Sequence, residues 1–354
     1  MTEIDPITGL AEQTFGLARL SDGTRVFHAL VRPGGEVVDI SDSFVSSDDL
    51  YEDWPRTFEE LERLDAKAAS TGTALADYRI LAPTERPQIF CAGSNYRQHA
   101  AEMYTFNDGH YQKERLPGES DEDFYERNLE FVTEKRATGA PFIWLATHGS
   151  LVGSEDDIAL PPVGHAHDWE AELTVVIAGG SPRYMTPDEA GDYIAGYTIA
   201  NDMHTGDLFS RTDIKWNADW IAKQQPTFKQ VGPFVVPKQF LSDRSDLTIR
   251  LDVNNKTMQN WPANDMIFSP EDYLAYASER LPVLPGDLLM MGSPPGNGGV
   301  SGQFLVPGDT VDISIDGLGR QHHRVVAEDT RGRSPYFGLP VLETAPSAQP
   351  NASS

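Results

Sequence analysis

Proline and glycine interrupt this chain at short intervals, and that spacing constrains its fold more than any other feature. The 354 residues include 30 glycines and 25 prolines, many of them adjacent, as in Pro161-Pro162, Pro285-Gly286 and Pro307-Gly308. Short apolar runs lie between these breaks and are predicted to be strands, at 173–178, 196–200, 232–236, 247–253, 287–291 and 310–315. The pattern favours a many-stranded sheet or barrel over a doubly wound α/β fold.

The first 82 residues are predicted to form a small N-terminal α+β domain. Three alternating runs are separated by turn-forming residues, as in hairpins, and cover 15–20, 25–31 and 36–40. A helix follows, for which Thr57 and Glu60 would form a capping box. The stretch 81–87 is interpreted as a linker to a larger domain at 83–342. The tail at 343–354, rich in Ala, Ser and Pro, is expected to be disordered.

Charge and cysteine content exclude several classes of function. The chain carries 54 acidic and 28 basic residues, a formal net charge of −26. Nucleic acids and anionic membrane surfaces are therefore not expected partners, because both bind clustered Lys and Arg. The single cysteine, Cys91, cannot form an intrachain disulfide, which fits a reducing compartment. With no long apolar stretch and no signal-peptide pattern at the start, we expect a cytoplasmic protein.

Two further segments have a recognisable pattern: one is a predicted helix and the other is an acidic insertion. Ser269 is the expected N-cap of a helix over 269–280, with Pro270 at its first position. The strongly acidic segment 103–140 shows weak helical periodicity around Phe124, Leu129 and Phe131. It is either a solvated surface insertion or a mobile lid over the residues that precede it.

Three carboxylates are candidates for a metal site. The motif DWEAEL at 168–173 opens an apolar run, and residues two apart on a strand share a face, about 6.6 Å apart. Glu170 and Glu172 would then converge, and such close carboxylates need a cation or protons between them. Asp202 ends another strand-like run and could complete the set. Oxygen ligands of this kind select Mg²⁺, Mn²⁺ or Ca²⁺. The alternative is two surface glutamates and a turn-forming aspartate.

Other side chains are candidates for proton transfer and charge stabilisation. His99 and Glu102 lie three apart on a predicted helix, so a carboxylate could orient the imidazole as a general base. An ordinary surface ion pair is the alternative. Lys223 is an isolated cation in an apolar stretch and could pair with the carboxylates or cover an apolar patch. Ser293, in a Gly/Pro loop, could offer a hydrogen bond to an oxyanion or serve only the turn.

Each motif is weak alone, but together and in this order they resemble the fumarylacetoacetate hydrolase family. The resemblance covers about 87–326 and rests on the following motifs: NYRQHAAE at 95–102, DWEAEL at 168–173, GYTIAND at 196–202, Lys223 ahead of Gly232-Pro233, DMIFS at 265–269, LPGD at 284–287, GSPPG at 292–296 and FLVPGD at 304–309. It implies a mixed β-sandwich roll, usually a homodimer, with a small N-terminal domain in many members.

The resemblance also implies roles for individual residues. Glu170, Glu172 and Asp202 would hold one Mg²⁺ or Mn²⁺ per subunit, with Ca²⁺ as a possible substitute. His99 and Glu102 would form a water-activating dyad, with Lys223 beside the metal and Tyr96, Arg97 and Ser293 near the substrate. Eukaryotic fumarylacetoacetases have an aspartate ligand where this chain has Ala92, which indicates the bacterial branch with three carboxylates.

Departures from the family pattern fall on the part that contacts the substrate. The family often reads D-x-S-A-R-D-x-Q from its metal-binding aspartate, whereas this chain reads DMHTGDLF at 202–209. The arginine position is Gly206 and the glutamine position is Phe209. We therefore expect a bulkier or less charged dicarbonyl substrate, with His204 or Arg211 as substitute contacts.

The sequence thus predicts a divalent-metal-dependent hydrolase. It would cleave a carbon–carbon bond in a 1,3-dicarbonyl or 2-oxo acid with water activated by His99 and Glu102. Two alternatives remain open at this point. One is a decarboxylase, tautomerase or isomerase, or hydratase that uses the same metal-stabilised enolate. The other is a non-catalytic binding homologue.

Overall fold

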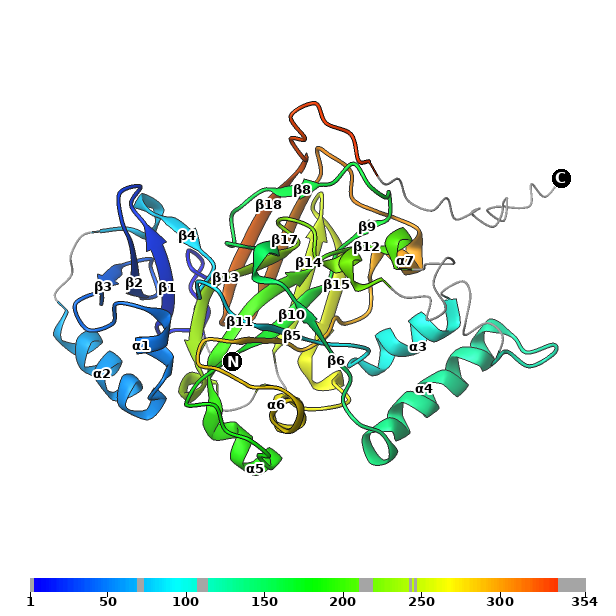
Figure 1. Cartoon of the computed structure of the whole chain (residues 1–354), viewed down its shortest axis with the longest axis horizontal. Helices are drawn as coiled ribbons and strands as arrows, with labels where there is room; N and C mark the ends of the chain where they lie inside the picture. The colour runs from blue at the N-terminus through cyan, green and yellow to red at the C-terminus, as the bar shows by residue number, and fades with distance from the viewer. Residues whose placement is uncertain are drawn as a thin grey trace.

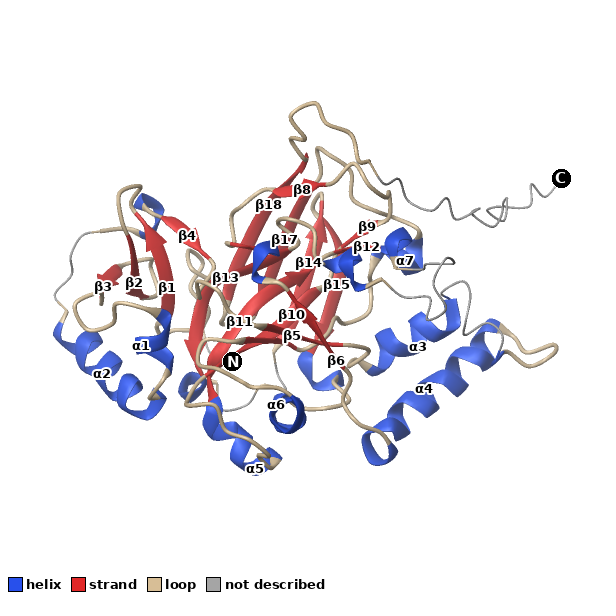
Figure 2. Ribbon diagram, in the orientation of Figure 1, coloured by secondary structure: helices blue, strands red, loops and turns tan. Residues whose placement is uncertain are grey.

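The apolar runs become strands of two sheets that pack face to face (Figure 2). The structure is a computed structural model and describes residues 3–68, 73–106, 114–209, 219–241, 244 and 247–336. The larger sheet has 11 strands, in the order β3-β2-β1-β13-β11-β10-β16-β5-β6, with β4 beside β1 and β7 beside β13. The smaller sheet has five strands, in the order β15-β14-β17-β18-β8. This arrangement confirms a mainly β, sandwich-like fold with some helix, and the described strands form no closed barrel.

The strand bounds agree with most of the expected runs. In the larger sheet they are β1 (Gly16–Ser21), β2 (Val26–Val31), β3 (Val37–Asp39), β4 (Arg79–Leu81), β5 (Ile89–Ala92), β6 (Ile143–Ala146), β7 (Leu151–Val152), β10 (Ala171–Ile177), β11 (Ile194–Asp202), β13 (Lys229–Pro237) and β16 (Leu288–Met290). In the smaller sheet they are β8 (Ile158–Leu160), β14 (Thr248–Val253), β15 (Lys256–Pro262), β17 (Thr310–Ile315) and β18 (Gly319–Ala327). A two-stranded pair joins β9 (His167–Asp168) to β12 (His204–Thr205).

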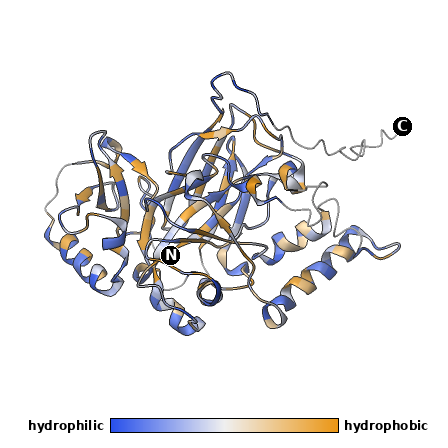
Figure 3. Ribbon diagram, viewed as in Figure 1, coloured by the Kyte–Doolittle hydropathy of each residue, from blue (hydrophilic) through white to orange (hydrophobic). Residues whose placement is uncertain are grey.

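Burial follows the position of each strand in the sandwich. Every residue of the central strands β10, β11 and β13 is buried. By contrast, β18 alternates between buried and exposed residues along most of its length, because one face packs on the larger sheet and the other meets solvent. Most of its residues are hydrophilic, as the colouring by hydropathy in Figure 3 shows. Gln321 of β18 ties the sheets together: its side-chain amide donates to the carbonyls of Ile199 and Gly232, each at 3.0 Å.

The helices lie at the edges of the sandwich (Figure 1). They are α1 (Ser47–Tyr51), α2 (Trp54–Lys67), α3 (Arg97–Phe106), α4 (Asp121–Thr138), α5 (Pro187–Ala190), α6 (Pro270–Arg280) and α7 (Gly298–Ser301). Helix α6 begins where the sequence predicts, with Ser269 as N-cap and Pro270 first. The predicted cap of the N-terminal helix is wrong: α2 begins earlier, because Asp53 caps it and Pro55 fits its first turn. None of the described helices has the length and apolar content that crossing a membrane requires.

The N-terminal strands are continuous with the larger sheet. Strand β1 pairs antiparallel with β13, placing Leu17 opposite Val235. The N-terminal unit, with α2 on one side, therefore extends the sheet at one end of the molecule (Figure 1). The domain boundary at residue 82 stays a prediction.

The acidic segment contains an 18-residue helix, α4, that packs beside α3 (Figure 1). Its buried stripe is Phe124, Asn128 and Val132, four residues apart. The Asn128 side chain donates to Thr105 Oγ1 of α3 at 3.1 Å. Phe131, which contributed to the weak helical periodicity of the sequence, is exposed. A lid role for this segment stays a prediction, and the predicted disordered tail lies outside the described residues.

Candidate active site

Adjacent strands bring the three predicted carboxylates together. Strands β10 and β11 pair antiparallel, with Glu172 opposite Ala200, and Glu170 directly precedes β10. Asp202 ends β11, and its backbone N–H donates to the Glu170 carbonyl at 2.9 Å. One oxygen from each of Glu170, Glu172 and Asp202 lies within 4.8 Å of the others. The strand alternation thus produces the predicted convergence, and we call these three side chains the carboxylate cluster.

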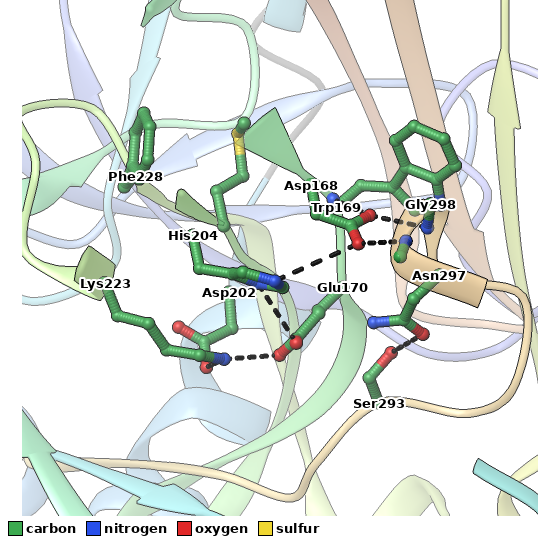
Figure 4. Close-up of polar contacts among 12 residues, drawn as sticks. Asp168, Trp169, Glu170, Asp202, His204, Lys223, Phe228, Ser293, Asn297 and Gly298 are labelled. Carbon is green, nitrogen blue, oxygen red and sulfur yellow. Dashed lines mark hydrogen bonds and ion pairs between the residues drawn. The ribbon is translucent and has the colours of Figure 1, made fainter. Parts of the chain in front are cut away.

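Two buried lysines face the carboxylate cluster. Lys223 ends a short 3₁₀ helix, η6 (Trp220–Lys223), and its Nζ lies 2.6 Å from Glu170 Oε2 and 2.8 Å from Asp202 Oδ2 (Figure 4). Lys229 of β13 stands opposite Asp202 in the strand register, and its Nζ lies 2.6 Å from Asp202 Oδ1. Burial alone would lower the pKa of Lys223, but the surrounding carboxylates raise it above its ordinary value. Lys223 is therefore charged at neutral pH.

The lysines leave one carboxylate without a cationic partner. Burial would raise the pKa of Glu170, but Lys223 and His204 hold it below its ordinary value. Glu172 accepts a hydrogen bond from the Gly292 backbone N–H at 2.7 Å. Burial, together with Asp202 and Glu170, raises its pKa well above the ordinary value. When all three carboxylates are ionised, they exceed the two ammonium groups by one negative charge, and a divalent cation would more than offset that excess. The residues thus fit a hard divalent metal.

An outer layer orients Glu170. Its Oε1 lies 3.2 Å from His204 Nδ1, and His204 Nε2 lies 3.9 Å from Asp168 Oδ2, so the imidazole stands between two carboxylates (Figure 4). The backbone N–H groups of Gly298 and Gly299 each donate to Asp168 at 2.7 Å. The predicted substrate contact His204 thus lies against a candidate metal ligand.

The predicted dyad lies on α3, and both side chains have unsatisfied polar atoms. Burial lowers the pKa of His99 to about 4, so the imidazole is neutral at pH 7. Burial raises the pKa of Glu102 to about 7, although the Gly296 backbone N–H partly offsets this rise. His99 Nδ1 and Glu102 Oε2 are buried without a hydrogen-bond partner. The carboxylate therefore does not hold the imidazole here, in contrast to the expectation from their spacing.

The remaining predicted contacts differ in their surroundings. Tyr96 is fully buried, and its hydroxyl has no hydrogen-bond partner. Arg97 forms an ion pair with Asp265 at 2.9 Å. Ser293 Oγ accepts a hydrogen bond from Gln259 Nε2 at 2.9 Å. Arg211 lies outside the described residues. The substrate roles of Tyr96, Arg97 and Ser293 stay predictions.

Sequence reasoning missed Lys229, Asp168 and Gln259. Lys229 stands between Phe228 and Gln230 at the start of an apolar strand, where a buried lysine is unusual enough to be noticed. Gln259 accepts from the Ala171 backbone N–H at 2.9 Å, between the two glutamates of the cluster. It lies in β15, a strand of the other sheet, so only the packing of the two sheets reveals its role.

The family model for the C-terminal domain of fumarylacetoacetate (FAA) hydrolase matches residues 88–326. The chain belongs to the fumarylacetoacetate hydrolase family. It is 32% identical over 250 residues to the rat protein named oxaloacetate tautomerase Fahd2a, mitochondrial, covering 70% of this chain and 69% of that protein. It is 35% identical over 203 residues to the 2,4-didehydro-3-deoxy-L-rhamnonate hydrolase of Sphingomonas sp. (strain SKA58), covering 56% of this chain and 68% of that one. Family members with these names include both tautomerases and hydrolases.

Solved structures share the fold. The 2-hydroxyhepta-2,4-diene-1,7-dioate isomerase of Mycobacterium marinum is 25% identical, with a TM-score of 0.60, and the match covers 89% of this chain and 100% of that one. The maleylpyruvate hydrolase of Sphingobium sp. SYK-6, solved with manganese(II) and pyruvate, is 24% identical, with a TM-score of 0.62 over 88% of this chain and 99% of that one. This family fold thus carries isomerases as well as hydrolases.

Proposed function

We propose that this protein is a divalent-metal-dependent hydrolase that cleaves a carbon–carbon bond in an acylpyruvate-like 1,3-dicarbonyl or 2-oxo acid. The observation that carries the proposal is the carboxylate cluster, whose charge two lysines only partly balance, on strands next to a buried neutral histidine. Hydrolase relatives within the family agree with it.

Glu170, Glu172 and Asp202 would hold the cation, Mg²⁺ or Mn²⁺. When bound, it would act as a Lewis acid on the substrate carbonyl oxygens and favour the enolate of the 2-oxo acid. The buried, oxygen-only donor set suits a hard cation. His204 and Asp168 would keep the Glu170 carboxylate in its orientation.

His99 would take a proton from the attacking water. Its low pKa keeps the imidazole unprotonated at pH 7, and its Nδ1 lacks a partner in the described protein. Glu102, with a pKa of about 7, is matched to exchanging that proton near neutral pH. Lys223 would stabilise negative charge on the substrate oxygens through its buried ammonium group.

The reaction balances with one water. Its hydroxide part adds to the acyl carbonyl, and the bond from that carbon to the adjacent CH₂ breaks. The electron pair passes to the CH₂ carbon, which takes the proton that His99 removed from the water. The products are a carboxylic acid and a 2-oxo acid.

A tautomerase is the second candidate. The named tautomerase relatives favour it, as does the presence on one helix of a neutral imidazole and a carboxyl group of pKa about 7. Such a pair can move a proton between carbon and oxygen of an enol without water.

Product analysis in ¹⁸O-labelled water separates the two candidates. The Mn²⁺-loaded protein is incubated with acetylpyruvate and with the enol of oxaloacetate. A hydrolase yields pyruvate and acetate that carries ¹⁸O. Faster enol–keto exchange of oxaloacetate with no cleavage of acetylpyruvate would overturn the proposed hydrolase in favour of the tautomerase.

We also propose a homodimer, from the family resemblance, and a cytoplasmic location, from the single cysteine that fits a reducing compartment. Analytical ultracentrifugation of the full chain tests the first part, and fractionation of the source cells tests the second. A monomer, or the protein in another compartment, would contradict these two parts without affecting the proposed chemistry.

A further inference from the structure

A row of aromatic side chains leads from the carboxylate cluster to the protein surface. The Phe209 ring lies 5.2 Å from that of His204, and the Trp220 ring lies 5.8 Å from Phe209 in an edge-to-face contact. Trp144 stacks on Trp220 at 5.6 Å, and Phe142 lies 5.8 Å from Trp220. We call Phe209, Trp220, Trp144 and Phe142 the aromatic row.

The inner end of the row contacts the site at two points. His204, next to Phe209, lies 3.2 Å from Glu170. The face of Trp144 lies 5.2 Å from Lys223 Nζ and 5.6 Å from Lys229 Nζ. The rings are therefore contiguous with the groups that would hold the polar end of a substrate.

The outer end of the row meets solvent. Trp220 is 41% exposed and Phe142 is 46% exposed. The exposed side chains of Ile221 and Leu145 follow Trp220 and Trp144 in the chain. A ligand that covers rings exposed to water is stabilised by burying their apolar surface. Adjoining exposed apolar side chains are typical of surfaces that bind a ligand or partner. The row thus has both an anchor in the site and a face free to bind.

Among the residues that the structure describes, the charges near the row do not favour an anionic partner. The two cations of the described site, Lys223 and Lys229, already contact Glu170 and Asp202. A carboxylate at the far end of a substrate would meet uncharged rings there and lose hydration without an ion pair. An apolar group would meet a matching surface.

We propose that the aromatic row binds an apolar tail, aromatic or alkyl, of a substrate whose oxygen-rich head binds at the carboxylate cluster. This inference rests on the proposed function and specifies its substrate class. The tail, and not a second copy of the chain, is the occupant, because the row continues directly from the candidate site through His204 and Lys223.

Three substrates that share the same dicarbonyl acid head and differ in their tails test this inference. Acetylpyruvate has a methyl tail, benzoylpyruvate has a phenyl tail, and 4-carboxybenzoylpyruvate places a carboxylate at the end of the same ring. With the Mn²⁺-loaded protein we expect kcat/KM for benzoylpyruvate to exceed that for each of the others by at least about tenfold. In Trp220→Ala and in Phe209→Gln, the ratio of kcat/KM for benzoylpyruvate to kcat/KM for acetylpyruvate should fall about tenfold. In Trp220→Phe this ratio should stay close to that of the wild type.

Phe131→Ala is the matched control, because it removes an exposed ring of α4 that contacts Tyr104 and not the row. It should leave the ratio unchanged. Equal kcat/KM for the three substrates, or an unchanged ratio in Trp220→Ala, would overturn the inference while the proposed function stands. If Trp220→Ala alters only the mass of the assembly, the row is a subunit interface and the inference is wrong. If none of the three compounds binds or reacts, the proposed function itself fails.

Discussion

Lys229 Nζ lies 2.6 Å from the backbone carbonyl oxygen of Lys223, so one buried lysine holds the segment that carries the other. Lys229 is fully buried and reaches this carbonyl from β13, while its ammonium group also pairs with Asp202 at 2.6 Å. The Lys223 side chain then extends from η6 to Glu170 and Asp202. Lys229 is therefore a positioning residue for Lys223 as well as a counter-ion.

Lys229→Met should destabilise the metal-free protein by about 3–5 kcal/mol, because Asp202 would keep only Lys223, which it shares with Glu170, and the buried cluster would gain a further unbalanced negative charge. A divalent cation supplies the missing charge, so Mn²⁺ should raise Tm by more in this variant than in the wild type. Denaturant unfolding and thermal scans with and without Mn²⁺ measure both effects. Lys256→Met, at an exposed lysine of β15, is the control. An equal rise in Tm with Mn²⁺ in Lys229→Met and in the wild type would contradict the proposed charge balance.

Glu172→Gln should have opposite effects on metal-free stability and on metal binding. Glu172 is buried, and its pKa is raised by burial and by two neighbouring carboxylates, so a neutral amide should stabilise the metal-free protein at pH 7. Its affinity for Mn²⁺ should fall by more than the ~10–100-fold typical of losing an outer-layer partner. Isothermal titration with Mn²⁺ compares it with Asp168→Asn, which removes such a partner. A smaller loss in Glu172→Gln than in Asp168→Asn would exclude Glu172 as a ligand.

The parts of the site that follow from local periodicity could be predicted from sequence, and those that depend on pairing between distant segments could not. Glu170 and Glu172 share a face because strand side chains alternate, and that is visible in the DWEAEL motif. Lys229 stands opposite Asp202 only because β13 pairs with β11 in a register that shifts between Tyr197 and Ile199. No local pattern fixes such a register.

Helices show the same division. Helix α6 could be placed because its cap, proline and first-turn acids are adjacent in sequence. Helix α4 gave only a weak signal, because its buried stripe is narrow and includes the polar Asn128, which bonds to Thr105 of α3. The aromatic row was invisible for a related reason, since Trp144, Phe209 and Trp220 come from three separate segments.

His99→Ala should lower kcat by at least ~10²-fold, the usual effect of losing a general base. Mn²⁺ affinity should change little, because His99 is not part of the carboxylate cluster. Steady-state kinetics on the turned-over dicarbonyl, with a parallel Mn²⁺ titration, separate the two quantities. His322→Ala, at an exposed histidine of β18, is the control. Full turnover by metal-loaded His99→Ala would show that another group activates the water.

The pH dependence of stability should reveal the environment of Glu102. Its folded pKa of about 7 lies above the ordinary value of 4.5, so the folded chain binds more protons than the unfolded chain between these values. The stability that the neutral carboxyl contributes is present below pH 4.5 and is lost as pH rises through 7. Glu102→Gln removes this titration. The variant should therefore gain stability relative to the wild type as pH rises, by about 2 kcal/mol after allowance for partial exposure.

Urea unfolding of both metal-free proteins at several values between pH 4.5 and pH 8 measures this difference. Glu130→Gln, at an exposed position of α4, serves as the control for replacing a glutamate by glutamine. His99 acts in the opposite direction, since its folded pKa of about 4 lies below 6.5 and its contribution is lost as pH falls. The two side chains therefore offset each other in the wild type, and only the variant separates them. A difference between Glu102→Gln and wild type that stays constant with pH would show that Glu102 is not desolvated, and it could not then exchange protons near pH 7 as the proposed reaction requires.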